Sequence, residues 1–167
     1  VLFGGLQKIT SEQLGLSPSL VDLTPAVLDR LGISVEFLLD RQNRLAALAQ
    51  IVNDTIRRGG SILMPAFAVG RAQALLLLLQ RLKAAGSIPQ GLPIFLDSPM
   101  AIEATAVYRK FRGLLRTPAS EIESLCDGVR LITTPAQSQR LTRSRYPSVI
   151  ISASGMATGG RVLGHLK

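Results

Sequence analysis

The stretch that decides the fold of this chain is Gly59-Gly60-Ser61-Ile62-Leu63-Met64-Pro65-Ala66-Phe67-Ala68-Val69-Gly70-Arg71-Ala72-Gln73. Residues 61–64 predict a short buried strand, because the run is mainly apolar and is closed by a proline. A turn of small residues follows, and then a helix. A second stretch repeats this order near the other end: Val149-Ile150-Ile151-Ser152-Ala153-Ser154-Gly155-Met156-Ala157-Thr158-Gly159-Gly160-Arg161. In each stretch, an apolar strand leads to a loop of small residues and then to a single arginine.

These two corners have the composition of an anion-binding site. Small residues let backbone N–H groups approach a ligand closely, and the start of a helix favours negative charge. Two such corners at one edge of a parallel sheet would form a rim that binds anions.

Strands and helices alternate along the chain from Arg44 onward. The apolar periodicity and the Gly and Pro breaks predict four strands and six helices. The strands are expected at 61–64, 92–96, 129–132 and 148–152, and the helices at 44–58, 71–85, 100–111, 120–125, 134–144 and 158–166. This alternation predicts an α/β fold, with a mostly parallel sheet covered by helices on both faces. Residues 1–43 are expected to be an irregular segment of short helices and loops, and residues 44–167 to form one domain.

The carboxyl ends of the strands are where ligands gather in such sheets. Arg71 follows the first of these ends, where its planar guanidinium could bind two phosphate oxygens at once. The alternative is an ordinary surface arginine, although a cation is mildly unfavourable at a helix start. We interpret Arg71 as a phosphate contact.

Asp97, Ser98 and Pro99 end the second strand. The order favours a helix N-cap, in which Asp97 or Ser98 accepts a backbone N–H bond and Pro99 occupies the first turn. Alternatively, Asp97 lies at the edge of the site and orients a neighbouring group, while Ser98 contacts phosphate.

Ser154 and Arg161 belong to the last corner, which is dense in small residues and hydroxyls. It predicts a phosphate cradle, with a flexible turn as the alternative. No Lys-Ser or Lys-Thr pair follows the glycines, so the corner is not a nucleoside-triphosphate P-loop. His165 is the only histidine. It is interpreted as a helix-surface or packing residue, because a zinc site needs three or four ligands.

Composition narrows the class of partner. The chain has 167 residues, 47% of them hydrophobic, which is enough for one core. Nineteen Lys and Arg against eleven Asp and Glu give a net charge of +8. This charge favours a nucleic acid or an anionic membrane surface as the partner; the alternative is that it serves solubility alone. The single cysteine excludes an internal disulfide, and the longest apolar run is too short to cross a bilayer. The chain lacks an initiating Met and stops in mid-pattern, so it is expected to be a piece of a longer protein.

Three motifs in this order closely resemble the β-CASP ribonucleases of the metallo-β-lactamase superfamily. They are residues 60–73, the Phe95-Leu96-Asp97-Ser98-Pro99-Met100-Ala101 stretch with Thr105 and Tyr108, and residues 150–166. The resemblance implies a two-domain nuclease whose metallo-β-lactamase domain binds two zinc ions, and a β-CASP domain that closes over them and contacts RNA. It makes Arg71, Ser98, Ser154 and Arg161 candidate RNA or phosphate contacts, with Asp97 at the edge of the site.

The family's metal-binding motif, His-x-His-x-Asp-His, does not occur in this sequence. Its Glu-Ser-Thr-Tyr-Gly stretch is also missing ahead of Arg44, so residues 1–43 would be at most a remnant of the metallo-β-lactamase domain. We therefore expect this chain to bind RNA but not to cleave it alone, with no metal ligand of its own and with zinc bound elsewhere in a full-length cytoplasmic RNA-processing hydrolase. Two alternatives remain open: a non-catalytic RNA-binding or scaffold homologue, and a small-molecule phosphate or nucleotide site.

Overall fold

The computed structural model describes the backbone of residues 35–166 and the side chains of residues 44–166. The chain forms two compact units, Val1–Leu48 and Ala49–Lys167. The sheet and all the candidate site residues belong to the second unit. The structure predicted for residues 1–34 lies outside the described residues.

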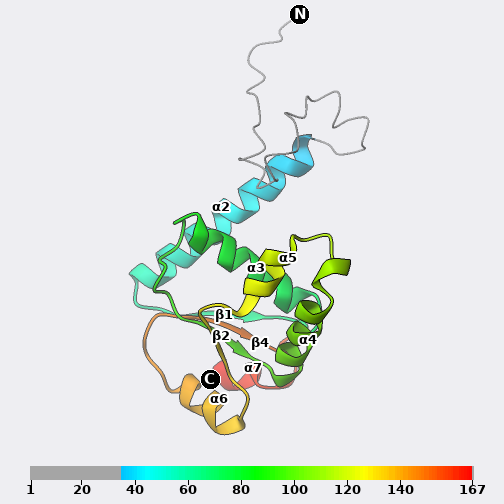
Figure 1. Cartoon of the computed structure of the whole chain (residues 1–167). Helices are drawn as coiled ribbons and strands as arrows, with labels where there is room; N and C mark the ends of the chain where they lie inside the picture. Colours follow the sequence, from blue (N-terminus) through cyan, green and yellow to red (C-terminus); the bar gives the residue numbers. More distant parts are fainter. Residues whose placement is uncertain (1–34, 167) are drawn as a thin grey trace, which may run out of the picture. The chain divides into compact units, whose positions relative to one another are not determined.

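Four parallel strands form the sheet of the second unit (Figure 1). They are β1 (Ile62–Pro65), β2 (Ile94–Asp97), β3 (Val129–Leu131) and β4 (Val149–Ser152), in the order β1-β4-β2-β3. The predicted α/β class and the positions of all four predicted strands are confirmed. Strand β1 was predicted to be buried but is half-buried at every residue, because it lies at the edge of the sheet. The two central strands, β2 and β4, are buried at every position, as expected for strands covered on both faces.

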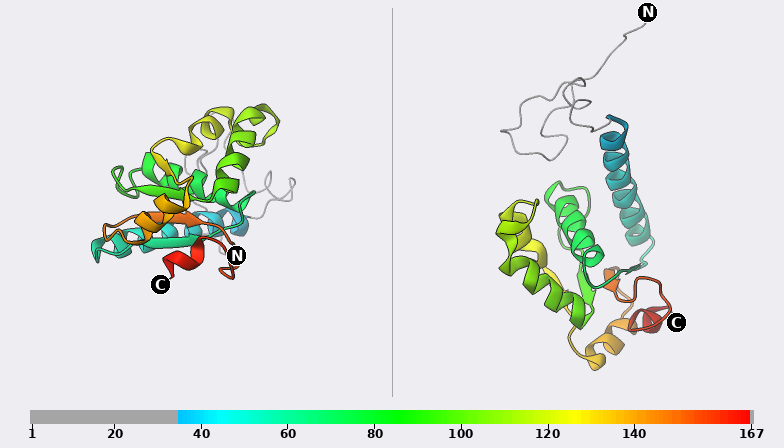
Figure 2. Two further views of the ribbon diagram at one scale, coloured as in Figure 1. Left: turned by 90° about the horizontal axis from the view of Figure 1, so that it is seen from below. Right: turned by 90° about the vertical axis from the view of Figure 1, so that its right-hand side faces the viewer.

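The helices divide between the two faces of the sheet. One face carries α3 (Arg71–Ala84), α4 (Pro99–Lys110) and α5 (Ala119–Glu123), and the other carries α6 (Pro135–Thr142) and α7 (Val162–His165) (Figures 1 and 2). Right-handed crossovers explain this division, because the chain runs from β1 past β4 to β2 and β3 and then turns back to β4. Two 3₁₀ turns, η1 (Arg112–Leu114) and η2 (Ser124–Cys126), complete the connections.

The core is aliphatic except for Phe95 and lies between the sheet and the helices. Leu76 and Leu79 of α3 are fully buried and pack over the sheet. On the strands, Leu96, Val149 and Ile151 are also fully buried. No helix within residues 35–166 has the length and apolar character needed to cross a membrane.

Two helices, α2 and α7, begin far from their predicted starts, and α5 lacks its predicted cap. Helix α2 (Val35–Arg57) begins well before Arg44, because neither Gly nor Pro interrupts residues 35–57, so residues 35–43 are helical and not irregular. Helix α5 begins after Pro118 without a side-chain cap, so Ser120 does not cap it. Helix α7 begins only at Val162, because Gly160 has a φ of +74°, which a right-handed helix does not allow.

Candidate functional site

The two glycine-rich corners lie side by side at one edge of the sheet. β1 pairs with β4 so that their last residues, Pro65 and Ser152, are opposite each other. The loops that follow also touch, since a Cβ added to Gly155 would lie 2.9 Å from Cγ and Cδ2 of Phe67. We call the segments that follow the four strands (residues 66–71, 98–100, 132–134 and 153–161) the carboxyl edge; they include the first residues of α3 and α4. The prediction that both corners share one edge of a parallel sheet is confirmed.

Arg71 is the exposed cation of the first corner. Its guanidinium carbon lies 4.9 Å from the centre of the Phe67 ring, within the range of a cation–π contact. No hydrogen-bond or ion-pair acceptor for this guanidinium is found among the residues that the structure describes. Its N–H donors are therefore available to an anion from solution.

Part of the backbone of this corner, in contrast, is satisfied internally. The N–H groups of Gly70, Arg71 and Ala72 donate to Gln73 Oε1, Val69 O and Phe67 O, at 2.7, 3.1 and 3.2 Å. The N–H groups of Phe67, Ala68 and Val69 have no acceptor within residues 35–166. The first corner therefore offers an anion the Arg71 side chain and part of the backbone nest that the glycine pattern suggested.

Gln73 is a buried residue that holds this loop in place. Its Oε1 accepts the Gly70 N–H bond, and its Nε2 donates to Ala68 O at 3.1 Å and to Thr105 Oγ1 of α4 at 2.9 Å. Gln73 was not among the residues predicted to form the site. A glutamine at the third position of a helix is typical of capping boxes, and that signal could have identified it.

Ser154 lies in the second corner and is half-buried. Its hydroxyl oxygen accepts a long bond of 3.4 Å from Met156 N, and its carbonyl accepts from Ala157 N at 3.1 Å. Within residues 35–166, the backbone N–H groups of Gly155, Thr158 and Gly159 have no acceptor. Unpaired N–H groups in a glycine loop suit an anion, so this corner keeps the features of the predicted cradle.

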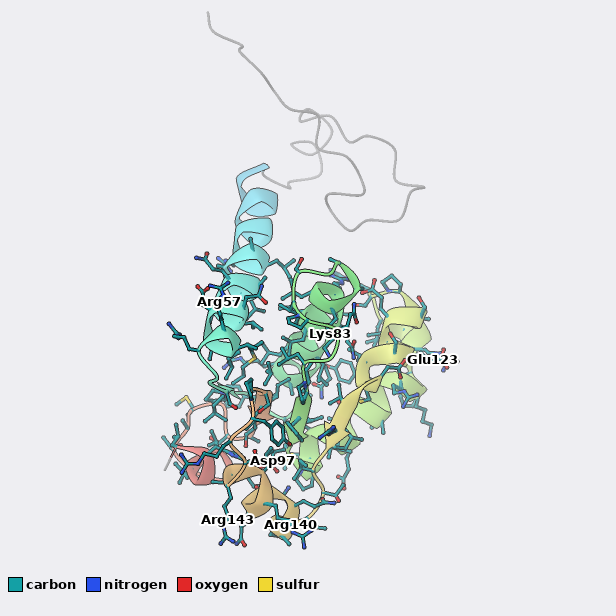
Figure 3. The ribbon with its side chains drawn as sticks, turned by 90° about the vertical axis from the view of Figure 1, so that its left-hand side faces the viewer. Arg57, Lys83, Asp97, Glu123, Arg140 and Arg143 are labelled. Atoms are coloured by element: carbon teal, nitrogen blue, oxygen red, sulfur yellow. The ribbon has the colours of Figure 1, made fainter. Side chains whose placement is uncertain are left out.

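Asp97, the last residue of β2 (labelled in Figure 3), is fully buried and is the centre of a polar network. Its Oδ2 accepts a bond from Ser138 Oγ at 2.5 Å and lies 2.7 Å from His165 Nε2. Its Oδ1 accepts from Arg161 Nη1 at 2.8 Å. The network joins β2 to α6 and α7, which lie below the sheet in Figure 1.

The charge of Asp97 is maintained by these partners. Burial by itself would raise the pKa of the Asp97 carboxyl, since it disfavours the charged form. Hydrogen bonds from His165, Ser138 and Arg161, together with the charge of Arg161, outweigh burial and leave the pKa below its usual value of 3.8. Asp97 is therefore an anion at neutral pH and anchors the positive Arg161.

Arg161 is held on all sides by this network. Besides Asp97, its guanidinium donates to Ile132 O and Thr133 O, both at 2.9 Å, and its side chain is only 20% exposed. It thus joins the ends of β2 and β3 to the start of α7. Its contact with RNA stays a prediction, and its bonds show a structural role that the sequence analysis did not foresee.

Ser98 and His165 are also occupied by internal bonds. Ser98 is buried and its Oγ accepts from Ala101 N at 3.2 Å, which confirms the helix-cap interpretation. The His165 side chain is 3% exposed and its Nδ1 lies 3.2 Å from Thr142 Oγ1, so its interpretation as a packing residue holds. The sequence did not indicate that His165 would contact Asp97.

The described residues do not fit a zinc site. No group of three or more His, Cys, Asp or Glu side chains within residues 44–166 is placed to hold a metal ion. Asp97 and His165 do meet, but the other oxygen of that carboxylate binds the Arg161 guanidinium, which would repel a cation. This part of the chain therefore offers a candidate anion-binding edge and no metal centre.

Comparison with known proteins gives the family. The Beta-Casp domain model matches residues 72–167, more than half of the chain. The chain is 34% identical over 127 residues to Ribonuclease TTHA0252 of Thermus thermophilus, covering 71% of this chain and 28% of that protein. It is 31% identical over 144 residues to the transcription termination factor FttA of Thermococcus kodakarensis, covering 81% of this chain and 22% of the relative.

A third relative, the RNase J-like protein of Methanocaldococcus jannaschii, is 34% identical over 121 residues, which cover 72% of this chain and 28% of that protein. The chain therefore spans about a quarter of the length of the curated relatives that it matches. The matched region contains α3, the sheet from β2 onward and the Asp97 network. This chain belongs to the Beta-Casp domain family, and the resemblance seen in its sequence motifs is confirmed.

Proposed function

We propose that this chain is the RNA-contacting part of an RNA-processing hydrolase, and that RNA binds at the carboxyl edge through Arg71. The relatives named as a ribonuclease and as RNase J-like support RNA as the ligand. The single observation that carries the proposal is the Arg71 guanidinium, which is exposed at this edge and has no acceptor among the described residues.

The charges of the edge fit a sugar-phosphate backbone. Its segments, residues 66–71, 98–100, 132–134 and 153–161, contain no Asp or Glu. Asp97 lies next to them but is buried and paired with Arg161. A phosphate at this edge would meet Arg71, and beside it the hydroxyl of Ser154 and the free N–H groups of the second corner. In this proposal Ser98 and Arg161 contribute by holding the loops.

For the whole protein, we propose zinc-dependent cleavage of RNA phosphodiester bonds, with the metal held by a metallo-β-lactamase domain outside the described residues. Zinc would supply an activated water for hydrolysis. We place this protein in the cytoplasm. The chain alone is proposed to bind RNA without cutting it, because residues 44–166 do not fit a metal site.

The test is binding of this chain to a fluorescein-labelled 12-mer of oligouridylate, measured by anisotropy over a salt series. Arg71→Ala should weaken binding and lower the salt slope by about 0.7, the value for one phosphate contact on a single strand. Arg58→Ala is the matched control, since Arg58 is an exposed arginine located before β1, at the opposite end of that strand. Equal losses in the two variants would contradict the proposal, and competition by uridine monophosphate alone would favour a mononucleotide site.

A second candidate is an RNA-binding homologue that does not cleave. The similarity to FttA favours it, because that relative is named as a transcription termination factor and not as a nuclease. Incubation of this chain with labelled RNA and zinc, with and without a chelator, tests the proposed lack of cleavage. Zinc-dependent products would contradict it.

A further inference from the structure

We propose that Phe67 and Arg71 together form a stacking platform for one unpaired nucleobase, so that the edge selects single-stranded RNA. This inference rests on the proposed function, since it concerns the same edge. It goes further because it assigns a base contact to Phe67, for which no role was predicted, and to Arg71, for which only a phosphate contact was predicted.

The first argument is the geometry of the pair. Phe67 is 48% exposed, although it follows the half-buried strand β1 and the buried Ala66. The Arg71 guanidinium lies over its ring at 4.9 Å, so the ring supports one side of this cation. A base can stack on the outer side of a guanidinium or on the exposed part of an aromatic ring, and both modes are common in single-strand recognition.

The second argument is that the pair is held in position before any ligand binds. The Phe67 carbonyl accepts from Ala72 N at 3.2 Å, and the buried Gln73 fixes the rest of the loop. On the other side, the backbone of Gly155 lies so close that an added Cβ would be 2.9 Å from the Phe67 ring. Stacking on a fixed surface loses less conformational entropy than stacking on a mobile one.

The third argument is the surroundings. Val69 and Met156 are 61% and 71% exposed, and their loops lie on either side of the Phe67–Gly155 contact. Apolar side chains next to an unpaired cation suit a ligand that is flat and apolar on its faces and negatively charged along one side. An unpaired nucleotide has this chemistry, and the absence of Asp and Glu from the edge excludes a specific site for a basic peptide.

The test uses this chain and two fluorescein-labelled 12-mers, oligoadenylate and an abasic chain of the same length and charge. Phe67→Ala should lower the affinity for oligoadenylate by about tenfold, the range of one stacked base, and leave the affinity for the abasic chain unchanged. Phe67→Trp should retain binding, because it keeps an aromatic face. A duplex made from oligoadenylate and oligouridylate should bind no better to the parent chain than to Phe67→Ala.

The matched control is Phe111→Ala. Phe111 is also 48% exposed and has Lys110 Nζ 5.5 Å from its ring centre, but it follows α4 away from the carboxyl edge. Equal effects of Phe67→Ala and Phe111→Ala, or an equal loss on the abasic chain, would overturn the platform. If the parent chain binds neither 12-mer, the proposed function itself fails, which is a separate result.

Discussion

Asp97 Oδ1 and Arg161 Nη1 lie 2.8 Å apart in an ion pair whose carboxylate is fully buried. The pair connects the end of β2 to the loop after β4, across the edge where the ligand is proposed to bind. The ion pair fixes the end of the glycine-rich loop at residues 153–161, whose start is fixed by β4. The stability of this unit and the shape of its binding edge therefore depend on the same residues.

Asp97→Ala should be among the most destabilising single substitutions in the described part of the chain. It would leave the Arg161 guanidinium without its counter-charge and remove the acceptor of Ser138. Breaking one partner of a buried ion pair costs about 3–5 kcal/mol. Urea unfolding should show this loss, and Asp127→Ala, at an exposed position, should change the free energy of unfolding by less than about 0.5 kcal/mol. Similar values for the two variants would contradict the role of the network.

The stability of the chain should fall in acid partly through Asp97. Its pKa is lowered in the folded state from 3.8, so its contribution is complete above about pH 4 and is lost as the pH falls further toward the folded-state pKa. Unfolding midpoints measured from pH 7 to pH 3 should therefore decline less steeply for Asp97→Asn than for the parent chain. Parallel curves would show that Asp97 does not titrate differently on folding.

Gln73→Leu should weaken both folding and RNA binding. The variant would leave the N–H of Gly70 and the carbonyl of Ala68 without their partner, at a cost of about 1–3 kcal/mol. Because the same bonds shape the loop below Phe67 and Arg71, oligouridylate should bind more weakly. Gln80→Leu, on the same helix with one exposed bond to Asp127 O, is the control. A loss of stability with full RNA affinity would separate Gln73 from the binding edge.

Gly155→Ala should disturb the edge, whereas Gly159→Ala should not. The new methyl group at position 155 would lie 2.9 Å from the ring and the backbone nitrogen of Phe67, so that residue would have to move. Nothing lies within 4 Å of a methyl group at Gly159. Gly155→Ala should therefore unfold at a lower temperature and bind oligouridylate more weakly than Gly159→Ala. Unchanged binding by Gly155→Ala would show that the position of Phe67 does not matter.

The fold could be predicted to a large extent, because its signals are local. Apolar runs bounded by Gly and Pro located all four strands, and the Ser98-Pro99 and Thr134-Pro135 pairs marked two helix starts through capping. The predicted start of α7 was wrong, because a Gly159-Gly160 pair is compatible with either a loop or the start of a helix. Only the backbone φ of Gly160 distinguishes the two.

The network around Asp97 could not be predicted in the same way. Its members, Ser138, Arg161 and His165, are 41 to 68 residues away from Asp97 in sequence, and only the strand order brings them together. Sequence motifs suggested that Arg71 and Arg161 were equivalent. The structure distinguishes them, since one guanidinium has three internal acceptors and the other is exposed.

Arg140 and Arg143 offer a competing basic surface. Both are exposed, Arg140 on α6 and Arg143 directly after it, and in Figure 3 they point away from Asp97. The most direct test of RNA binding at the carboxyl edge is therefore to locate the binding site. This can be done by ¹⁵N–¹H chemical-shift mapping of this chain titrated with the oligouridylate 12-mer. We predict the largest shifts in residues 66–72 and 153–160, with small shifts in residues 58–61 and 135–143. Shifts concentrated on α6, or on the loop before β1, would contradict RNA binding at the carboxyl edge.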